Sequence, residues 1–455
     1  MKNFLVGQKL INQKEFGKAL EFFLNFKKKK IVGDEIFFYL GLIYFELNNP
    51  VKSIYNLNKF LKKKPNSIQA LYNLAFVKQS LGQVDAAKSI YLRLLELDKN
   101  KIRPYYGLYT LDQSFLDEDK IEKILSLKKN FKNNLFDQGI IEYLLSKREK
   151  KNKNYLKEID YLNNSHKLIF ESKKPYNISS QYYFNEIISK FYDKLKFFNE
   201  DKVRKINTLI SPIFIIGLPR SGSTLVEAIL GSASKNINTI GECHVINMAV
   251  LDQIAPIIYE RDFKIDQFSF EIDIKKLKET SIRKYKQFGF DDELNDQIVI
   301  DKSLENFFNI EAIIKIFPNA KFLHTHRNYK DSIISIYQSF LAELSWTHSI
   351  KDIIIYVDNY IKILNFYKSK FPNSIMDIDL EEFTKSSETI SKDLFNFCGL
   401  SWNSKALKFY ERRDLYSKTL SFSQIRNKVS SYNSKKYHPY YHLLNVYKKE
   451  FKFLN

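Results

Sequence analysis

The chain has 455 residues, more than one ordinary domain holds, so two or three domains are expected. A hydrophobic fraction of 44% supports packed cores, and only 13 glycines and 10 prolines argue for much helix and against long disordered linkers. The net charge of +20 favours an anionic partner, but the lysines are scattered, so most of that charge is interpreted as solvated surface. No nucleic-acid-binding module is recognisable, so no nucleic-acid partner is predicted.

The two cysteines, Cys243 and Cys398, exclude a disulfide framework and suit a reducing compartment. The first residues lack the apolar run of a signal peptide, and no stretch approaches the ~18–20 apolar residues of a membrane span. We therefore expect a cytoplasmic protein without a membrane span.

The first hundred residues repeat. Tyr39-Leu40-Gly41 and Asn73-Leu74-Ala75 lie about 34 residues apart, which is the period of a tetratricopeptide unit. The same offset pairs Asn48 with Gly82, which we place in the turns between helices. Small residues at Gly7, Gly41 and Ala75 would let paired helices approach closely.

This pattern resembles the tetratricopeptide family. Two units are clear, residues 1–30 suggest a third, and residues 104–129 a degraded fourth. Because a single helical hairpin cannot bury its apolar face, such units stack into a superhelix. We predict an all-α superhelix over residues 1–130, with a generic helical bundle as the alternative.

Residues 131–205 are interpreted as a Lys-rich helical connector without chemistry, with a domain boundary near Asp201–Ser211. Residues 206–455 form the last predicted domain. It begins with Ile213-Phe214-Ile215-Ile216, a short apolar run typical of a buried strand. A glycine-bounded loop over 217–224 and a helix over 225–230 follow. This order aims backbone N–H groups and a helix N-terminus at a phosphate.

The loop has the spacing of a Walker A motif with one departure. Gly217 and Gly222 bracket four residues and Thr224 takes the Ser/Thr position, but Ser223 stands where the phosphate-binding lysine belongs. Arg220 supplies a donor inside the loop instead. The departure argues against an ATPase or kinase and for a 5′-phosphate that bears another anionic group.

The segment Pro219-Arg220-Ser221-Gly222-Ser223-Thr224-Leu225 resembles the 5′-phosphosulfate loop of sulfotransferases that use 3′-phosphoadenosine 5′-phosphosulfate, PAPS. The resemblance implies an α/β P-loop-type domain with a mostly parallel sheet. It also implies that all seven residues contact the co-substrate.

A second predicted phosphate site follows the strand over residues 321–326. Arg327 ends that strand, and Ser335 lies eight positions later in the next helix. An Arg followed by a Ser at this spacing resembles the family's 3′-phosphate site, and an Arg fork matches phosphate geometry. Few ligands need both a 5′- and a 3′-phosphate pocket, and PAPS does.

Later residues extend the resemblance to most of 211–437. Ser421, Gln424 and Lys436 match a segment that closes over the nucleotide in relatives with tetratricopeptide repeats or tyrosylprotein activity. The resemblance implies that Ser421 and Lys436 bind the co-substrate. The chain departs from the family there, with Lys428 in place of Pro and Tyr437 as the aromatic residue.

Transfer of a sulfuryl group needs a base and a cation. Glu242 resembles the catalytic Glu of the tyrosylprotein sulfotransferase branch, and His244 is the alternative base. Arg220 and Lys302 are the predicted cations for the leaving phosphate. No metal is expected, because His244, His324 and His326 lack ligand-like spacing to Cys or acidic partners.

The leading hypothesis is therefore a PAPS-dependent sulfotransferase acting on a hydroxyl. The acceptor could be a tyrosine of a peptide or protein held by the repeats, or a sugar, lipid or small metabolite. The alternatives are a P-loop nucleotide kinase and a non-catalytic repeat scaffold with a degenerate transferase domain. A protein partner on the repeat array is possible.

Overall fold

The computed structural model describes residues 4–28, 33–131, 133–203, 212–234, 236–258, 270–288, 298–412, 415–419 and 421–455. By packing, the chain forms two compact units. The repeat unit comprises Met1–Lys123, Arg283–Asp291 and Tyr410–Arg426. The sheet unit comprises Ile124–Ile282, Asp292–Phe409 and Asn427–Asn455. The boundary expected near Asp201–Ser211 falls mostly on 204–211, outside the described residues.

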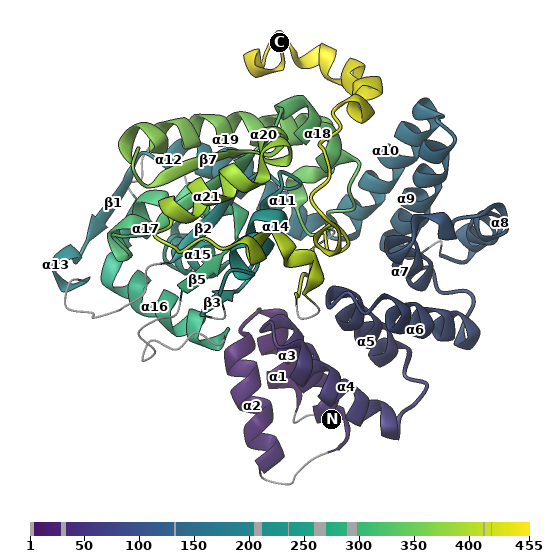
Figure 1. Cartoon of the computed structure of the whole chain (residues 1–455). Helices are drawn as coiled ribbons and strands as arrows, with labels where there is room; N and C mark the ends of the chain where they lie inside the picture. Colours follow the sequence, from purple (N-terminus) through teal and green to yellow (C-terminus); the bar gives the residue numbers. More distant parts are fainter. Residues whose placement is uncertain are drawn as a thin grey trace. The chain divides into compact units, whose positions relative to one another are not determined.

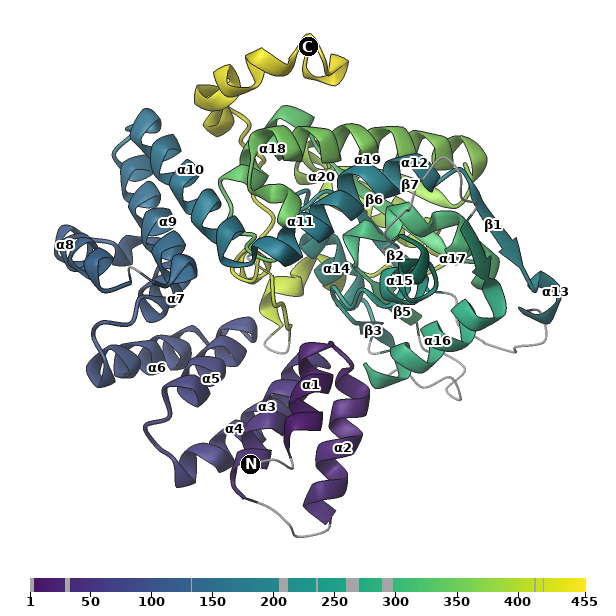
Figure 2. The same ribbon diagram turned by 180° about the vertical axis from the view of Figure 1, so that it is seen from behind.

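The repeat unit is built from helical hairpins, as the 34-residue period predicts. Its helices are α1 (Leu5–Asn12), α2 (Phe16–Lys28), α3 (Glu35–Glu46), α4 (Pro50–Lys63), α5 (Ile68–Ser80), α6 (Val84–Leu97) and α7 (Arg103–Leu111), and α8 (Glu118–Leu127) begins in it. Figure 1 and Figure 2 show α3 beside α4 and α5 beside α6.

Small residues and left-handed turns hold these hairpins together. A Cβ on Gly41 would lie 2.7 Å from Leu57 Cγ, so only glycine lets α3 and α4 approach this closely. Ser53 Oγ donates to Gly41 O at 2.7 Å across the same pair. Asn48 and Gly82 have positive φ in the turns after α3 and α5, which is where the repeat places them.

The segment Tyr410–Arg426 also belongs to the repeat unit. Ser417 N donates to Ser80 O at 3.0 Å, and Lys418 Nζ donates to Glu46 O at 2.9 Å. Tyr416 Oη donates to Phe45 O at 3.3 Å. A segment distant in sequence thus bonds to carbonyls at the ends of α3 and α5.

The sheet unit begins with a helical layer that the sequence indicated only as a connector. It contains α9 (Leu135–Lys151), α10 (Tyr155–Ser172), α11 (Lys174–Tyr182), a π-helical turn (Tyr183–Ile187) and α12 (Ile188–Phe191). Figure 2 shows α9 and α10 side by side. Gly139 permits this contact, since a Cβ there would lie 2.6 Å from Ile169 Cδ1.

The five-stranded sheet has the order β3-β5-β2-β6-β7, and all its strand pairs are parallel, as predicted. The strands are β2 (Ile213–Gly217), β3 (Ile237–Thr239), β5 (Ile298–Asp301), β6 (Lys321–His326) and β7 (Ile375–Asp379). Every residue of β2 is buried, and Phe214 stacks on Phe322 with ring centroids 5.3 Å apart. Burial on both faces explains the apolar run of β2.

The remaining elements surround this sheet or follow it. A second sheet pairs β1 (Leu195–Phe198) with β4 (Phe270–Asp273) in parallel. The other α-helices are α13 (Glu200–Val203), α14 (Ser223–Gly231), α15 (Val245–Ile258), α16 (Ile274–Gln287), α17 (Ile310–Ile316), α18 (Tyr329–Tyr337), α19 (Ile350–Lys370), α20 (Leu380–Lys385) and α21 (Ser387–Phe397). The longer 3₁₀ segments are η6 (Leu304–Asn309), η8 (Ser404–Glu411) and η10 (Lys435–Tyr447). Among the described helices, none combines the length and apolar character needed to cross a bilayer.

Candidate functional site

The candidate site lies at the carboxyl edge of the five-stranded sheet. Because the strands are parallel, the loops that leave their carboxyl ends meet at one edge, where ligands bind in open α/β sheets. The phosphate loop leaves β2, and Arg327 leaves the neighbouring strand β6. Lys302 leaves β5 on the other side of β2, and Glu242 follows the adjacent β3. The topology thus brings four separate sequence predictions to one edge.

Backbone geometry shapes the phosphate loop. Gly217 has φ 147°, and a Cβ there would lie 2.3 Å from Thr325 O on β6. Gly222 has φ 94° and is the N-cap of α14, whose N-terminus faces the loop. Arg220 has φ 69°, a left-handed conformation that non-glycine residues rarely adopt and that the surrounding fold must hold in place.

The Ser221 side chain bonds within the protein, and its contact with a co-substrate stays a prediction. Its Oγ donates to Leu218 O at 2.6 Å and lies 2.8 Å from Thr325 Oγ1. The hydroxyl therefore fastens the loop to itself and to β6. The other predicted loop residues lie beside it or on the first turn of α14: Pro219, Gly222, Ser223, Thr224 and Leu225.

Arg327 is only 5% exposed. Its Nη1 donates to Tyr437 Oη at 3.1 Å, and its Nη2 donates to Asp331 O at 3.3 Å. Within the described part of the chain, its buried Nε has no hydrogen-bond partner. A guanidinium with spare donors at a strand end suits an oxyanion ligand.

The two predicted phosphate residues share one electrostatic environment. Burial lowers the pKa of Arg220, and the positive charge of Arg327 lowers it further. Two cations at neighbouring strand ends, one half-buried and one buried, repel each other, and a bound anion would relieve that repulsion. The charge pattern thus favours an anionic ligand that reaches both arginines.

Tyr437 occupies the position next to Arg327 and Ser335. Burial opposes ionisation of its phenol, but the charge of Arg327, a hydrogen bond with Ser335 and the charge of Lys436 outweigh burial and lower the pKa of Tyr437. Lys436 Nζ lies 5.0 Å from the centroid of the Tyr437 ring. The predicted residues Arg327 and Ser335 therefore bond to the Tyr437 hydroxyl, and Lys436 lies over its ring.

Lys302 lies between two carboxylates. Its side chain is 1% exposed, and its Nζ lies 2.9 Å from Glu242 Oε1 and 3.6 Å from Glu227 Oε2. Burial alone would lower the pKa of Lys302, but Glu242 and Glu227 outweigh burial and raise it. Removing both carboxylates would leave a buried ammonium without compensation, which typically costs about 3–5 kcal/mol.

The turn that carries Glu242 is tied to the end of β5. Ile240 N donates to Ile300 O at 3.0 Å, and Lys302 N donates to Gly241 O at 3.0 Å. His244 N donates to Ser303 Oγ at 2.8 Å. These bonds continue the pairing of β3 with β5 and bring Glu242 to Lys302. The Glu242 side chain remains 40% exposed, so an acceptor can approach it.

His244, the alternative base, contacts Glu305 through Nδ1. Its side chain is 42% exposed. Its φ of 55° shows that the turn forces an unusual backbone conformation on it. Both candidate bases therefore lie on one turn, and each has a charged partner.

Comparison with known proteins identifies both parts of the chain. Residues 212–404 match the sulfotransferase family, and residues 35–67 and 69–100 match the tetratricopeptide repeat. This chain joins tetratricopeptide repeats to a sulfotransferase-family domain. An uncharacterised protein of Aquifex aeolicus (strain VF5) is 24% identical over 408 residues, which are 88% of this chain and 52% of that protein. The chain thus spans about half the length of this curated relative.

Two solved structures show a weak likeness. The sulfotransferase domain of the Synechococcus PCC 7002 olefin synthase is 15% identical, covers 51% of this chain and 89% of its own, and has a TM-score of 0.34. Sulfotransferase STF1 from Mycobacterium tuberculosis H37Rv is 14% identical, covers 68% of this chain and 92% of its own, and has a TM-score of 0.32. TM-scores this low carry no weight, so the assignment rests on the family matches.

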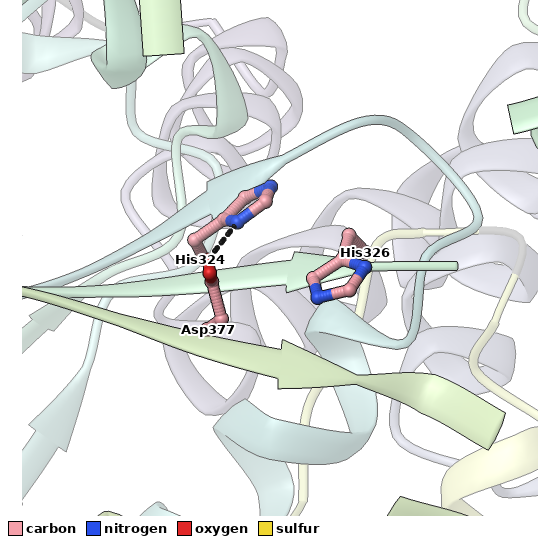
Figure 3. Close-up of side chains that lie close together, drawn as sticks. All are labelled: His324, His326 and Asp377. Carbon is pink, nitrogen blue, oxygen red and sulfur yellow. Dashed lines mark hydrogen bonds and ion pairs between the residues drawn. The ribbon is translucent and has the colours of Figure 1, made fainter. Parts of the chain in front are cut away.

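The sulfotransferase-family domain also contains a histidine cluster that sequence spacing did not indicate. His324, His326 and Asp377 place ligand atoms within 4.8 Å of one another, because β6 and β7 bring them together (Figure 3). His324 Nδ1 bonds to Asp377, and its Nε2 contacts Tyr360 Oη. Lys368 Nζ lies 2.6 Å from Asp377 Oδ1. These protein partners already use both ring nitrogens of His324 and neutralise the carboxylate, so we interpret the cluster as a structural network.

Ser421 stands apart from the other predicted co-substrate residues. It belongs to the repeat unit, where its backbone N donates to Thr419 Oγ1 at 3.3 Å. Lys436 belongs to the sheet unit. Binding of the nucleotide by Ser421 therefore stays a prediction.

Sequence reasoning missed three groups near the sulfotransferase-family site. Glu227 on α14 pairs with Lys302, as described above. On α9, Lys147 Nζ donates to Gln338 O at 2.6 Å, and Lys150 Nζ donates to Gln338 Oε1 at 2.7 Å. Burial and the charge of Lys150 lower the pKa of Lys147 to about 7. The sequence holds no signal for these lysines, because one Lys-rich helix resembles another until its packing partners are known.

Proposed function

We propose that this chain transfers a sulfuryl group from PAPS to a hydroxyl acceptor. The observation that carries the proposal is the placement of two arginines, the half-buried Arg220 after β2 and the buried Arg327 after β6, at neighbouring strand ends where their charges repel. A nucleotide with phosphates at both its 5′ and 3′ positions has charges to match both. The match of residues 212–404 to the sulfotransferase family supports the same reading.

The chemistry of the donor set fits PAPS. The loop after β2 offers backbone N–H groups, the N-terminus of α14 and Arg220 to the 5′ end. Arg327 and Ser335 bond to the Tyr437 hydroxyl and Lys436 lies over its ring, which supports a 3′-phosphate site at this position. When bound, PAPS supplies an activated sulfuryl group.

The two alternatives are less consistent with the site. A nucleotide kinase needs a lysine in the loop, and Ser223 stands there. A non-catalytic scaffold has no use for the buried Lys302 between two carboxylates, since such charges cost free energy to bury. ATP dependence, or the absence of any nucleotide binding, would favour these alternatives.

We propose that Glu242 removes the proton from the acceptor hydroxyl. An ionised carboxylate next to Lys302 is ready to accept a proton, and its partial exposure leaves it open to an acceptor. Lys302 and Arg220 face the same edge and stabilise the negative charge that develops on the leaving phosphate. His244 is the alternative base on the same turn.

The acceptor and the repeat partner are proposed only as classes. The acceptor is a hydroxyl of a peptide or protein tyrosine, a sugar, a lipid or a small metabolite. The repeat hairpins suit a protein partner. The free thiols of Cys243 and Cys398 support a cytoplasmic location.

Replacing Glu242 with alanine tests the base. We expect Glu242→Ala to lower kcat for sulfate transfer by ~10²–10⁴-fold, the range for a general base, and to leave the Kd for 3′,5′-adenosine bisphosphate unchanged. Labelled sulfate transfer from PAPS to peptides, glycans and cell extracts measures kcat, and calorimetry measures Kd.

Glu388→Ala is the matched control, because Glu388 pairs with Lys392 on the exposed surface of α21. It should behave as wild type. Full activity in Glu242→Ala together with its loss in His244→Ala would move the base to His244.

A further inference from the structure

Glu227 is a buried carboxylate on the helix that follows the phosphate loop. It lies on α14, about one turn after Thr224, and only 8% of the residue is exposed. Its helix neighbours Val226, Ala228 and Ile229 are buried and apolar. A charge at such a position costs free energy unless its partners compensate for it. Its contacts therefore indicate why a carboxylate stands there.

Glu227 binds both segments that carry the proposed catalytic side chains. Its Oε2 lies 3.6 Å from Lys302 Nζ, at the end of β5. Its carboxylate also accepts a hydrogen bond from the backbone N–H of Gly241, the residue before Glu242. Gly241 O in turn accepts a bond from Lys302 N at 3.0 Å. Glu227, Gly241 and Lys302 thus form a closed set of contacts that joins α14 to the ends of β3 and β5.

We infer that Glu227 is a positioning residue that holds Lys302 and the Gly241–Glu242 turn in one arrangement. The inference rests on the proposed function and gives Glu227 no contact with substrate. A group that fixes two catalytic side chains removes the entropy cost of aligning them, and a misplacement of about 1 Å can cost ~10²-fold in rate.

Glu227 also sets the charge around Lys302. One ammonium lies between two carboxylates, so the three ionised side chains together carry a net negative charge. Burial raises the pKa of Glu227, and repulsion by the Glu242 carboxylate raises it further. Repulsion between two like charges is mutual. Removing the Glu227 charge should therefore keep Glu242 ionised to lower pH. The other titratable groups on the adjoining segments are unchanged in the variants below: His244, Asp301 and Glu305.

The variant Glu227→Gln keeps the size of the side chain and its acceptor for Gly241 N–H, but removes the charge. We expect kcat for sulfate transfer to fall by roughly tenfold to a hundredfold, with the Kd for 3′,5′-adenosine bisphosphate unchanged. The acid limb of the kcat/KM profile should move to lower pH by on the order of one unit. Glu227→Asp retains the charge, so its acid limb should stay at the wild-type pH while its shorter side chain lowers kcat.

Glu142→Gln is the matched control, because Glu142 on α9 is 2% exposed and its Oε1 lies 2.6 Å from Nζ of the exposed Lys128. It should lower the melting temperature without moving the acid limb. The inference is overturned if Glu227→Gln keeps both the wild-type kcat and the wild-type acid limb of the kcat/KM profile. It is also overturned if Glu142→Gln shifts the acid limb by the same amount. If Glu227→Gln does not fold, a wild-type kcat in Glu227→Asp is by itself enough to overturn the inference. A wild-type protein that transfers no sulfate would instead overturn the proposed function.

Discussion

At the scale of single residues, Tyr437 occupies hydrogen-bond donors of the proposed 3′-phosphate site. Its hydroxyl accepts a hydrogen bond from Arg327 Nη1 at 3.1 Å and bonds with Ser335. Although burial opposes ionisation, these contacts and the charges of Arg327 and Lys436 lower the pKa of Tyr437. The same arginine lies under the Tyr432 ring, 5.6 Å from its centroid. A 3′-phosphate must displace the phenol oxygen or share its donors, so the phenol and the phosphate compete.

Removing this hydroxyl should tighten nucleotide binding. In Tyr437→Phe, Arg327 and Ser335 lose no protein bond when a phosphate arrives, so the Kd for 3′,5′-adenosine bisphosphate should fall by about two- to tenfold. Calorimetry checks this, with Tyr176→Phe as the control, because Tyr176 is 53% exposed on α11. Weaker binding by Tyr437→Phe would mean that the hydroxyl contributes to the nucleotide site.

At the scale of elements, a pair of histidines fastens α10 to the segments around α18 and α19. His166 Nε2 donates to Tyr337 O at 2.8 Å, so its neutral Nδ1 accepts from His348 Nδ1 at 3.2 Å. Burial lowers the pKa of His166 to about 3, and burial lowers that of His348 to about 4. Both rings are therefore neutral in the folded chain.

Acid should loosen this attachment. Both folded pKa values lie below the ordinary value of about 6.5, so the unfolded chain binds more protons and stability is lost as pH falls from about 6.5 towards about 4. His166→Gln keeps a donor for Tyr337 O but does not titrate, and it should reduce this acid destabilisation by on the order of 1 kcal/mol.

Denaturant unfolding at a series of pH values measures this effect. Both tryptophans, Trp346 and Trp402, belong to the sheet unit, so their fluorescence reports on the unit that contains the pair. His442→Gln is a suitable control, because His442 is exposed and bonds only to Pro439 O among the described contacts. An unchanged pH slope in His166→Gln would contradict the expectation.

The sequence predicted those elements of the site whose signal is local. A strand, a glycine-bounded loop and a helix follow one another over residues 213–230, and Arg327 and Ser335 lie within one strand–helix unit. The contacts that the sequence could not indicate join distant segments. Lys147 and Gln338 are 191 positions apart, and Arg327 and Tyr437 are 110 apart. Spacing along a chain predicts a motif, but long-range pairing depends on the assembled fold.

At the scale of the whole molecule, the net charge of +20 does not by itself show where an anion would bind, because that depends on where the fold gathers cations. Lysines such as Lys385 and Lys392 pair with carboxylates on the exposed surface, where ion pairs contribute little. The cations at the carboxyl edge differ because burial weakens screening by solvent and salt. Arg220 and Arg327 thus supply the positive charge of the proposed anion site, which the overall charge alone does not locate.

The central claim is that Arg220 and Arg327 bind opposite ends of one nucleotide. Calorimetry should compare 3′,5′-adenosine bisphosphate with adenosine 5′-monophosphate on wild type, Arg220→Ala and Arg327→Ala. Because bonds to charged groups are worth about 1.5–3 kcal/mol, each variant should bind the bisphosphate roughly ten- to a hundredfold more weakly. Only Arg220→Ala should weaken binding of the monophosphate, which lacks the 3′-phosphate. Unchanged bisphosphate affinity in Arg327→Ala, or equal losses for both nucleotides, would contradict the account.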